Sequence, residues 1–322
     1  MSHDAPELRA PDLRELEAAL RPHLAPALAP VGGFERLAPS GFARTPTPDA
    51  PVLLLALGRG GRPRAVVRCS APTGELVERE LLRSLHAKVR LGPELGEVVL
   101  EPLVSLRLAG RAHAVLPLCR PTPRAGLAGL RARLRLRRPL LQWLRAATAR
   151  TVRAPSEPER ARDLRAPLEW LARADGAPRA RRAAARAALG RLEGGAWRPR
   201  LALCHGDLWL GNVLRWPRAQ WWRARPARRP FALIDWAGSP GQGAPGYDLL
   251  CLAESLRLTP RRLGAELRAL RGLLACTPLD LRGYLLVALG ALGLARDHYD
   301  PSRAAAHAAR LEARLDAALA YV

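Results

Sequence analysis

The stretch His205-Gly-Asp-Leu-Trp-Leu-Gly-Asn212 carries the residues that decide how this sequence is interpreted. Short apolar runs rich in strand-forming residues surround it, at 201–204 before it and at 212–216 and 231–235 after it. We therefore expect a loop at 205–211 that links two strands.

Two carboxylates and a carboxamide in this region have the spacing of a phosphoryl-transfer site. Asp207 precedes Asn212 by five residues, as in the kinase catalytic loop, where the Asp accepts the substrate hydroxyl proton and the Asn holds Mg²⁺. Asp235 ends the next strand and supplies a second oxygen ligand, which hard cations prefer. A lone His-Gly-Asp can be an ordinary turn, so the prediction depends on the full set: Asp207 as base, with Asn212 and Asp235 as metal ligands.

The same stretch, followed by Ile234-Asp-Trp236 and Gly246-Tyr-Asp248-Leu-Leu250, resembles the aminoglycoside phosphotransferase and choline kinase-like superfamily, small-molecule relatives of the protein kinases. The resemblance covers most of the chain, and its motifs lie in 201–250. It implies an α+β, two-lobed protein-kinase-like fold with a small antiparallel β-rich N-lobe and a larger, mainly helical C-lobe. It also implies ATP and Mg²⁺ as cofactors and a hydroxyl of a small molecule as acceptor.

Two motif residues have mainly architectural roles in that family. The resemblance implies that His205 packs under the catalytic loop and that Asp248 braces the loop by hydrogen bonds from the following helix. A kinase-type mechanism already has its base in Asp207, and buried, hydrogen-bonded histidines are common. We therefore expect His205 to be structural.

The residues before the motif have the element order of a kinase-like N-lobe. Apolar positions at helical spacing predict a helix over 12–28, which is followed by strands, a second helix and a hairpin that turns at Gly110. Pro117-Leu-Cys-Arg-Pro121 then breaks the strand pattern and is interpreted as the hinge between lobes. We expect an N-lobe of 1–118 and a C-lobe of 119–322.

Arg68 stands where a kinase-like N-lobe carries the lysine that contacts the ATP phosphates and pairs with a helix Glu. A guanidinium also binds phosphate, but it is larger, planar and forked. Its helix partner is expected to be Glu78, with Glu80 as the alternative. Ser40-Gly41 is the candidate for the phosphate-covering loop, because glycine lets the backbone approach closely. The other interpretation of Arg68 is a strand-end residue on a solvent face.

The C-lobe is expected to be helical over 124–193 and again after a Gly/Pro-rich loop at 238–246. Four helices are predicted beyond that loop, over 247–256, 260–275, 279–294 and 302–320. In the family this last region builds the acceptor pocket. Its acidic candidates are Glu254, Asp297, Asp300 and Asp316, and ordinary surface carboxylates explain them equally well.

The segment 217–230 separates the second and third apolar runs and contains Trp221 and Trp222 among several arginines. Such a combination could stack bases or sugar rings. A loop whose tryptophans rest on neighbouring apolar surface is the commoner explanation, and we favour it.

Length and composition bound the class of protein. At 322 residues the chain fits two lobes. No run reaches the ~20 apolar residues that cross a bilayer, and the N-terminus lacks the basic start and apolar segment of a signal peptide. A cytoplasmic protein without a membrane span is therefore expected. Five widely spaced cysteines without a Cys-x-x-Cys pair are expected to be reduced, mostly buried thiols.

The formal net charge of +23 suggests nucleic acid or an acidic surface as a partner. Lys88 is the only lysine, however, and the abundance of Arg, Ala, Pro and Gly throughout is typical of a GC-rich coding bias. We therefore expect no specific nucleic-acid partner, and nothing in the sequence sets an oligomeric state.

Three hypotheses follow. The first is an ATP-dependent kinase acting on a small-molecule hydroxyl, and the second is a degenerate kinase-like protein that binds nucleotide without turnover. The third is a binder of anionic surfaces driven by charge alone. A strongly basic protein repels polycationic aminoglycosides at long range, but acidic residues inside a pocket could overrule that effect, so the acceptor is left open.

Overall fold

A computed structural model describes residues 10–40, 51–71, 75–108, 110–217, 223, 226–295 and 301–322. Contacts between residues divide the chain into two compact units. The first unit comprises Met1–Val89, Gly96–Thr122 and Val213–Ala237, and the second comprises Arg90–Leu95, Pro123–Asn212 and Gly238–Val322. The first unit therefore takes its residues from three separate parts of the chain.

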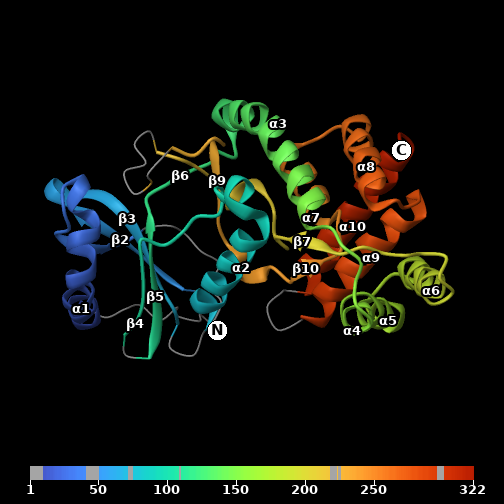
Figure 1. Cartoon of the computed structure of the whole chain (residues 1–322), viewed down its shortest axis with the longest axis horizontal. Coiled ribbons are helices and arrows are strands. Elements are labelled where there is room, and N and C mark those ends of the chain that lie inside the picture. Colours follow the sequence, from blue (N-terminus) through green and yellow to red (C-terminus); the bar gives the residue numbers. More distant parts are fainter. Residues whose placement is uncertain are drawn as a thin grey trace. The chain divides into compact units, whose positions relative to one another are not determined.

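A five-stranded antiparallel sheet forms the centre of the first unit, with the strand order β1-β2-β3-β5-β4 (Figure 1). Gly110 has a φ of +75° at the turn between β4 and β5, which glycine adopts without steric cost. The predicted hairpin is thus confirmed. The strands are β1 (Arg36–Pro39), β2 (Val52–Gly58), β3 (Arg62–Cys69), β4 (Val104–Leu108) and β5 (Arg111–Pro117).

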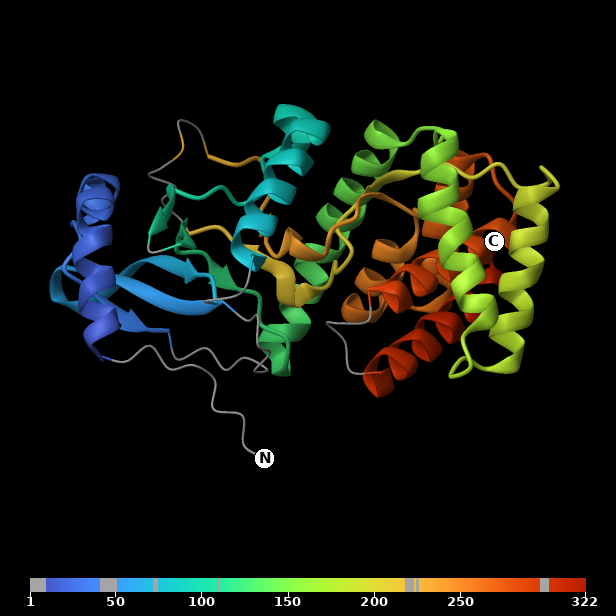
Figure 2. The same cartoon turned by 90° about the horizontal axis from the view of Figure 1, so that it is seen from below.

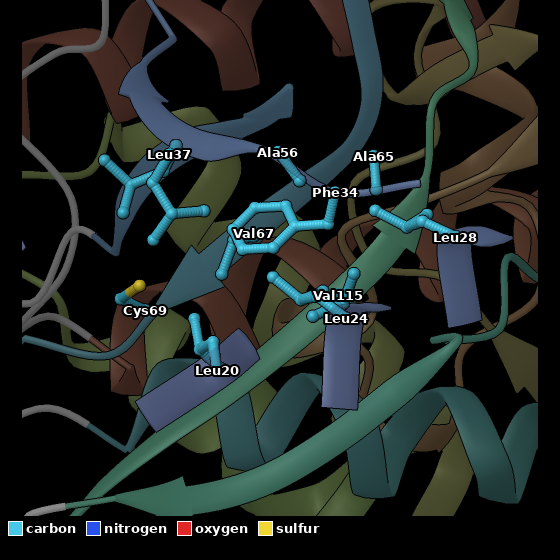
Figure 3. Packing of buried hydrophobic residues seen from close by; sticks show 11 residues of the cluster. Leu20, Leu24, Leu28, Phe34, Leu37, Ala56, Ala65, Val67, Cys69 and Val115 are labelled. Carbon is cyan, nitrogen blue, oxygen red and sulfur yellow. The ribbon is translucent and has the colours of Figure 1, made fainter. Parts of the chain in front are cut away.

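Helix α1 (Ala10–Leu28) covers one face of this sheet. Its buried residues Leu20, Leu24 and Leu28 recur every four positions, so they lie along one side of the helix. Figure 3 shows them gathered around Phe34 and Val67. This packing forms the main apolar cluster of the unit and confirms the helix predicted over 12–28.

Helix α2 (Leu76–Gly96) packs on the other face of the sheet. Val77 and Leu81 of α2 contact Ala112 and Ala114 of β5, whereas Val115 belongs to the α1 cluster. Successive strand residues point to opposite faces, so this division places α1 and α2 on opposite sides of one sheet.

A second, three-stranded sheet of the first unit has the order β6-β8-β9. Val213 of β8 pairs with Leu233 of β9 in antiparallel register, as expected for the strands that flank 217–230. The expected hinge contains β6, which pairs with β8. The strands are β6 (Arg120–Pro121), β8 (Val213–Arg215) and β9 (Phe231–Leu233).

The second unit is mainly helical (Figure 2). Helices α7 to α10 coincide closely with the four predicted over 247–320. The expected loop at 238–246 instead contains a short strand, β10, because Gly241 pairs with Cys204 of β7. The elements are α3 (Gly126–Thr151), α4 (Glu157–Glu159), a π-helical turn (Arg160–Arg165), α5 (Ala166–Arg173), α6 (Arg179–Glu193), β7 (Ala202–Cys204), β10 (Gly241–Gly243), α7 (Tyr247–Leu256), α8 (Pro260–Leu274), α9 (Pro278–Leu294) and α10 (Pro301–Leu319).

Two glycines of α9 let α5 approach closely, and the two helices lie side by side in both views (Figures 1 and 2). A Cβ at Gly290 would lie 2.1 Å from the carbonyl oxygen of Pro167, and a Cβ at Gly293 would lie 2.0 Å from the Trp170 ring. No real side chain fits at these distances. Glycine at both positions therefore sets where Trp170 lies against α9.

Within the described part of the chain, no single helix is long and apolar enough to cross a membrane. The pair α8 and α9, bent by 92°, meets the length and composition criteria only when the two helices are taken together.

Leu24 provides a test of the α1–sheet packing, because its side chain is 0% exposed. We expect Leu24→Ala to lower the free energy of unfolding by about 2–5 kcal/mol through lost apolar contact and the cavity left behind. Urea unfolding followed by circular dichroism measures the change. Leu82→Ala, at a leucine of α2 that is 63% exposed, is the control, and equal effects of the two substitutions would contradict the packing described.

Candidate functional site

The loop 205–212 of the second unit holds the Asp207 carboxylate in a defined orientation. Oδ2 of Asp207 accepts hydrogen bonds from Nδ2 of Asn212 at 2.8 Å and from Nε1 of Trp209 at 3.2 Å. Asn212 Nδ2 also lies 2.8 Å from the Asp207 carbonyl oxygen. The predicted base and the predicted metal ligand Asn212 are therefore direct neighbours.

Trp209 is a contributor that sequence reasoning missed. Besides donating to Asp207, its ring lies over Gly211, where a Cβ would be 2.4 Å from the indole. The guanidinium of Arg124, a residue of the same unit, lies over the Trp209 ring at 5.3 Å from its centroid. Its place in the motif between Asp207 and Asn212 was the only available signal, since tryptophan in a loop is usually interpreted as packing.

Asp248 of α7 anchors the start of this loop. Its carboxylate accepts the backbone N–H of His205 at 2.6 Å and that of Gly206 at 3.0 Å. Gly206 has a φ of +84°, and a Cβ there would lie 2.6 Å from the carbonyl oxygen of Gly238, so the turn requires glycine. The bracing of the loop from the following helix is thus confirmed.

His205 is buried beneath the same loop. Its Nδ1 accepts the backbone N–H of Asp207 at 3.3 Å, so the ring supports the residue that carries the carboxylate. This arrangement agrees with the structural role expected for His205.

In the first unit, Arg68 forms a buried ion pair with Glu80 at 2.6 Å. Arg68 and Glu80 are only 5% and 8% exposed. Val67 faces α1, so the next residue of β3 faces α2, and Arg68 pairs in register with Ala114 on that same face. The solvent-face interpretation of Arg68 is therefore wrong.

The helix partner of Arg68 is Glu80, and the expectation of Glu78 is corrected in favour of its alternative. Glu78 instead pairs with Arg107 of β4. Residues two positions apart on a helix face in nearly opposite directions. Because Val77 and Leu81 face the sheet, Glu80 shares their side of α2 and Glu78 does not.

Glu80 also connects Arg68 to Asp235. Its Oε1 accepts the backbone N–H of Asp235 at 3.0 Å, and Nη2 of Arg68 lies 3.9 Å from Oδ1 of Asp235. Asp235 has a left-handed backbone, with a φ of +68°, and a side chain that is 40% exposed. Such conformations persist only where surrounding contacts hold them, and the bond to Glu80 is one of these.

Arg68 has hydrogen-bonding capacity left over. Its Nε and Nη2 are buried and form no hydrogen bond with any described residue. An unsatisfied buried N–H costs about 1–3 kcal/mol, and a guanidinium satisfies this requirement well with phosphate oxygens. The geometry suits an anionic ligand.

The remaining nucleotide candidates are only partly described. The backbone N–H of Ser40 donates to the carbonyl oxygen of Leu53 at 3.2 Å, which continues the pairing of β1 with β2. Gly41 lies outside the described residues, as do Trp221, Trp222, Asp297 and Asp300.

Asn212 and Asp235 carry oxygen atoms that suit a magnesium ion. Within the described ranges, no group of three or more His, Cys, Asp and Glu side chains could hold a metal alone. Magnesium, however, usually keeps several waters and takes one or two protein ligands together with phosphate oxygens. Asn212 belongs to the second unit and Asp235 to the first, and each could supply one such oxygen ligand.

A pocket of about 430 Å³ lies in the second unit, and Asp207 forms part of its wall. This volume falls in the range of small-molecule sites. The other lining residues come mainly from α5, α9 and α10, so the pocket brings together segments far apart in the sequence.

No protein-family model and no curated protein matches this sequence. Solved structures do. A choline/ethanolamine kinase family protein from Mesorhizobium loti is 16% identical over 94% of this chain and 98% of that chain, with a TM-score of 0.51. Choline kinase LicA from Streptococcus pneumoniae is 15% identical over 95% and 100%, also with a TM-score of 0.51.

An aminoglycoside-3'-phosphotransferase of type VIII is 20% identical over 82% of this chain and 98% of that chain, with a TM-score of 0.45. The two kinases with the higher TM-scores show the fold: this chain has the α+β, two-lobed architecture of the small-molecule kinases. The resemblance and the fold class expected from the motifs are confirmed.

The buried carboxyl of Asp248 gives the loop a characteristic pH dependence. Burial raises the pKa of Asp248 from 3.8 to about 6, against the backbone hydrogen bonds from His205 and Gly206, which lower it. The pKa of Asp248 is higher in the folded protein than in the unfolded chain, so the protonated carboxyl stabilises the fold. This stabilisation is complete below about pH 4 and is lost as the pH rises through about 6.

We expect the free energy of unfolding of the wild-type protein, minus that of Asp248→Asn, to fall by about 3 kcal/mol between pH 4 and pH 7. The figure follows from the pKa shift, because each pKa unit corresponds to ~1.4 kcal/mol. Urea unfolding of both proteins across this pH range measures the difference. A difference that does not change with pH would show that Asp248 is not titrating in this environment.

Proposed function

We propose that this protein is an ATP-dependent kinase that phosphorylates a hydroxyl group of a small molecule. Asp207 accepts the hydroxyl proton while the acceptor oxygen forms a bond to the γ-phosphorus of ATP. The bond from the γ-phosphorus to the β–γ bridging oxygen breaks, and ADP leaves. Such a reaction needs positioning and charge stabilisation more than covalent chemistry from the protein.

The orientation of Asp207 in the wall of a ligand-sized pocket is the observation that carries this proposal. Two N–H groups, from Asn212 and Trp209, fix one oxygen of its carboxylate. A general base must lie within hydrogen-bond reach of the proton that it accepts. A hydroxyl compound seated in the pocket would meet this carboxylate directly.

The nucleotide side of the proposal is supported by the first unit. Arg68, oriented by Glu80, offers buried N–H groups to phosphate oxygens. A further structure of LicA, 13% identical and with a TM-score of 0.51, holds AMP, which favours an adenine nucleotide.

Asn212 and Asp235 would hold the magnesium ion. When bound, the ion would neutralise charge on the phosphate oxygens. The protein's own share is to supply an amide oxygen from Asn212 and a carboxylate from Asp235, whose backbone N–H is held by Glu80.

One observation favours a second candidate, a nucleotide-binding protein without phosphoryl transfer. The guanidinium of Arg68 lies 3.9 Å from Oδ1 of Asp235, so a permanent cation faces a carboxylate that a metal would need. A tight Arg68–Asp235 pair would leave nucleotide binding intact and weaken the metal site.

Asp207→Asn tests the leading proposal. We expect transfer from [γ-³²P]ATP to a panel of hydroxyl compounds to fall by about 10²–10⁴, since general-base catalysis contributes this much. Nucleotide affinity, measured by calorimetry, should be unchanged. Asp316→Asn is the control, because this carboxylate pairs with Arg282. Nucleotide binding by a wild-type protein that shows no transfer and no Mg²⁺-dependent ATP hydrolysis would favour the second candidate.

The pair Glu80→Gln and Glu78→Gln tests the nucleotide side. We expect Glu80→Gln to raise the KM for ATP by about tenfold, since an amide replaces a charge-assisted contact worth ~1.5–3 kcal/mol. Glu78→Gln, which affects the pair with Arg107 at the surface, should leave the KM for ATP within about twofold. Initial-rate kinetics distinguish the two, and equal effects would contradict the role given to Glu80.

A further inference from the structure

We infer that the outer side of helix α3 binds the surface of an anionic lipid bilayer. This inference is separate from the proposed function, since no residue of α3, which the structure describes throughout, lines the pocket that contains Asp207. It rests on two features that occur together on one side of the helix. Exposed leucines form a line there, and arginines without a carboxylate partner among the described residues stand beside them.

The outer side of α3 carries three leucines. Leu127, Leu130 and Leu134 are 73%, 45% and 55% exposed, and their spacing of three and four residues places them along one line of the helix. A surface helix usually turns charged or polar residues toward water, and a contiguous apolar patch typically marks a contact surface. The opposite side of the helix packs inward through buried residues: Ala132, Leu136, Leu140 and Trp143.

Arginines stand on both flanks of this line of leucines. Arg131 follows Leu127 by four residues and precedes Leu134 by three, while Arg137 and Arg138 follow Leu134 by three and four. Residues at these spacings are neighbours on the surface of a helix. The whole of α3 contains seven arginines and no acidic residue, so no charge of this surface is neutralised within the helix.

These arginines also have no ion pair with another element. In the described part of the chain, no carboxylate lies within ion-pair distance of Arg131, Arg137 or Arg138, whereas Arg145, about two turns further along α3, pairs with Glu266 at 2.8 Å. The abundance of arginine throughout the sequence explains how many charges α3 carries, but not their position around exposed leucines. Their guanidinium groups are therefore available to an external anion.

An anionic bilayer complements both features at once. Its phosphate groups accept hydrogen bonds from guanidinium groups, and the acyl chains just beneath them cover apolar side chains. The stem of an arginine is apolar, so the guanidinium reaches the phosphate layer while the leucines lie deeper. Nucleic acid also offers phosphates, but it has no apolar layer beneath them for a line of leucines. The leucines thus favour a bilayer over nucleic acid.

Flotation with lipid vesicles tests this inference on the full-length protein. One set of vesicles consists of equal parts of phosphatidylcholine and phosphatidylglycerol, and the other of phosphatidylcholine alone. At physiological ionic strength we expect the protein to float with the anionic vesicles and to partition at least about tenfold more weakly into the neutral ones. Equal partition into both, or no binding to either, would overturn the inference.

A pair of leucine variants separates this surface from binding by charge alone. Leu130→Gln together with Leu134→Gln keeps good helix formers and should lower partition into the anionic vesicles by about tenfold or more, because two side chains no longer enter the acyl layer. Leu279→Gln together with Leu294→Gln is the control. These leucines of α9, in the same unit, are 64% and 50% exposed, and their loss should change partition by less than about twofold. Equal partition of the α3 variant and the wild type would overturn the inference.

A pair of arginine variants tests whether position or net charge matters. Arg131→Gln together with Arg138→Gln should weaken partition into the anionic vesicles by about tenfold, since each arginine near such a surface contributes to binding. Arg261→Gln together with Arg262→Gln, at exposed positions in the first turn of α8, removes the same charge and should change partition by less than about twofold. Equal losses in the two variants would show that net charge drives the binding, which contradicts a surface on α3.

Duplex DNA added to the flotation mixture tests the other anionic partner. We expect the protein to remain on the anionic vesicles, because DNA does not cover the leucines. Displacement by DNA that the Arg131→Gln and Arg138→Gln variant binds less tightly would assign this surface to nucleic acid and overturn the inference. Thermal unfolding followed by circular dichroism checks that each variant is folded as the wild type is.

Discussion

The loop that carries the candidate base depends on one buried carboxylate. Asp248 accepts the N–H groups of His205 and Gly206 from the first turn of α7. Removing this carboxylate from water is unfavourable, as its raised pKa shows, and the two hydrogen bonds offset part of that cost. The turn at Gly206 then directs the chain to Asp207, where Asn212 and Trp209 orient the carboxylate.

A comparable constraint organises the first unit. Strand alternation directs Arg68 toward α2, where burial leaves it dependent on Glu80. The same glutamate accepts the N–H of Asp235, so one carboxylate orients both a candidate phosphate ligand and a candidate metal ligand. Breaking a buried ion pair leaves an uncompensated charge, which makes this three-residue arrangement sensitive to the loss of any one member.

Much of the fold follows from local sequence pattern. Leu20, Leu24 and Leu28 at intervals of four residues predict the packing side of α1, and the helices α7 to α10 are legible from their apolar periodicity and breaks. The strand β10 was missed because Gly241–Gly243 has no strand propensity of its own and is held by pairing with β7. Sequence spacing also left Glu78 and Glu80 as alternatives, because only contact with the sheet shows which side of α2 faces inward.

From the sequence alone came the prediction of the chemistry: Asp207, Asn212 and Asp235 stand in an order and spacing that indicate phosphoryl transfer. Local spacing suffices for this because a catalytic loop is a continuous segment of chain. The tertiary structure decided the environment of these groups. Whether Glu254 is available to a ligand depends on Arg310, and whether Trp170 lines the pocket depends on Gly293. Such pairings join residues far apart in the chain, so burial and charge balance become defined only when the helices pack.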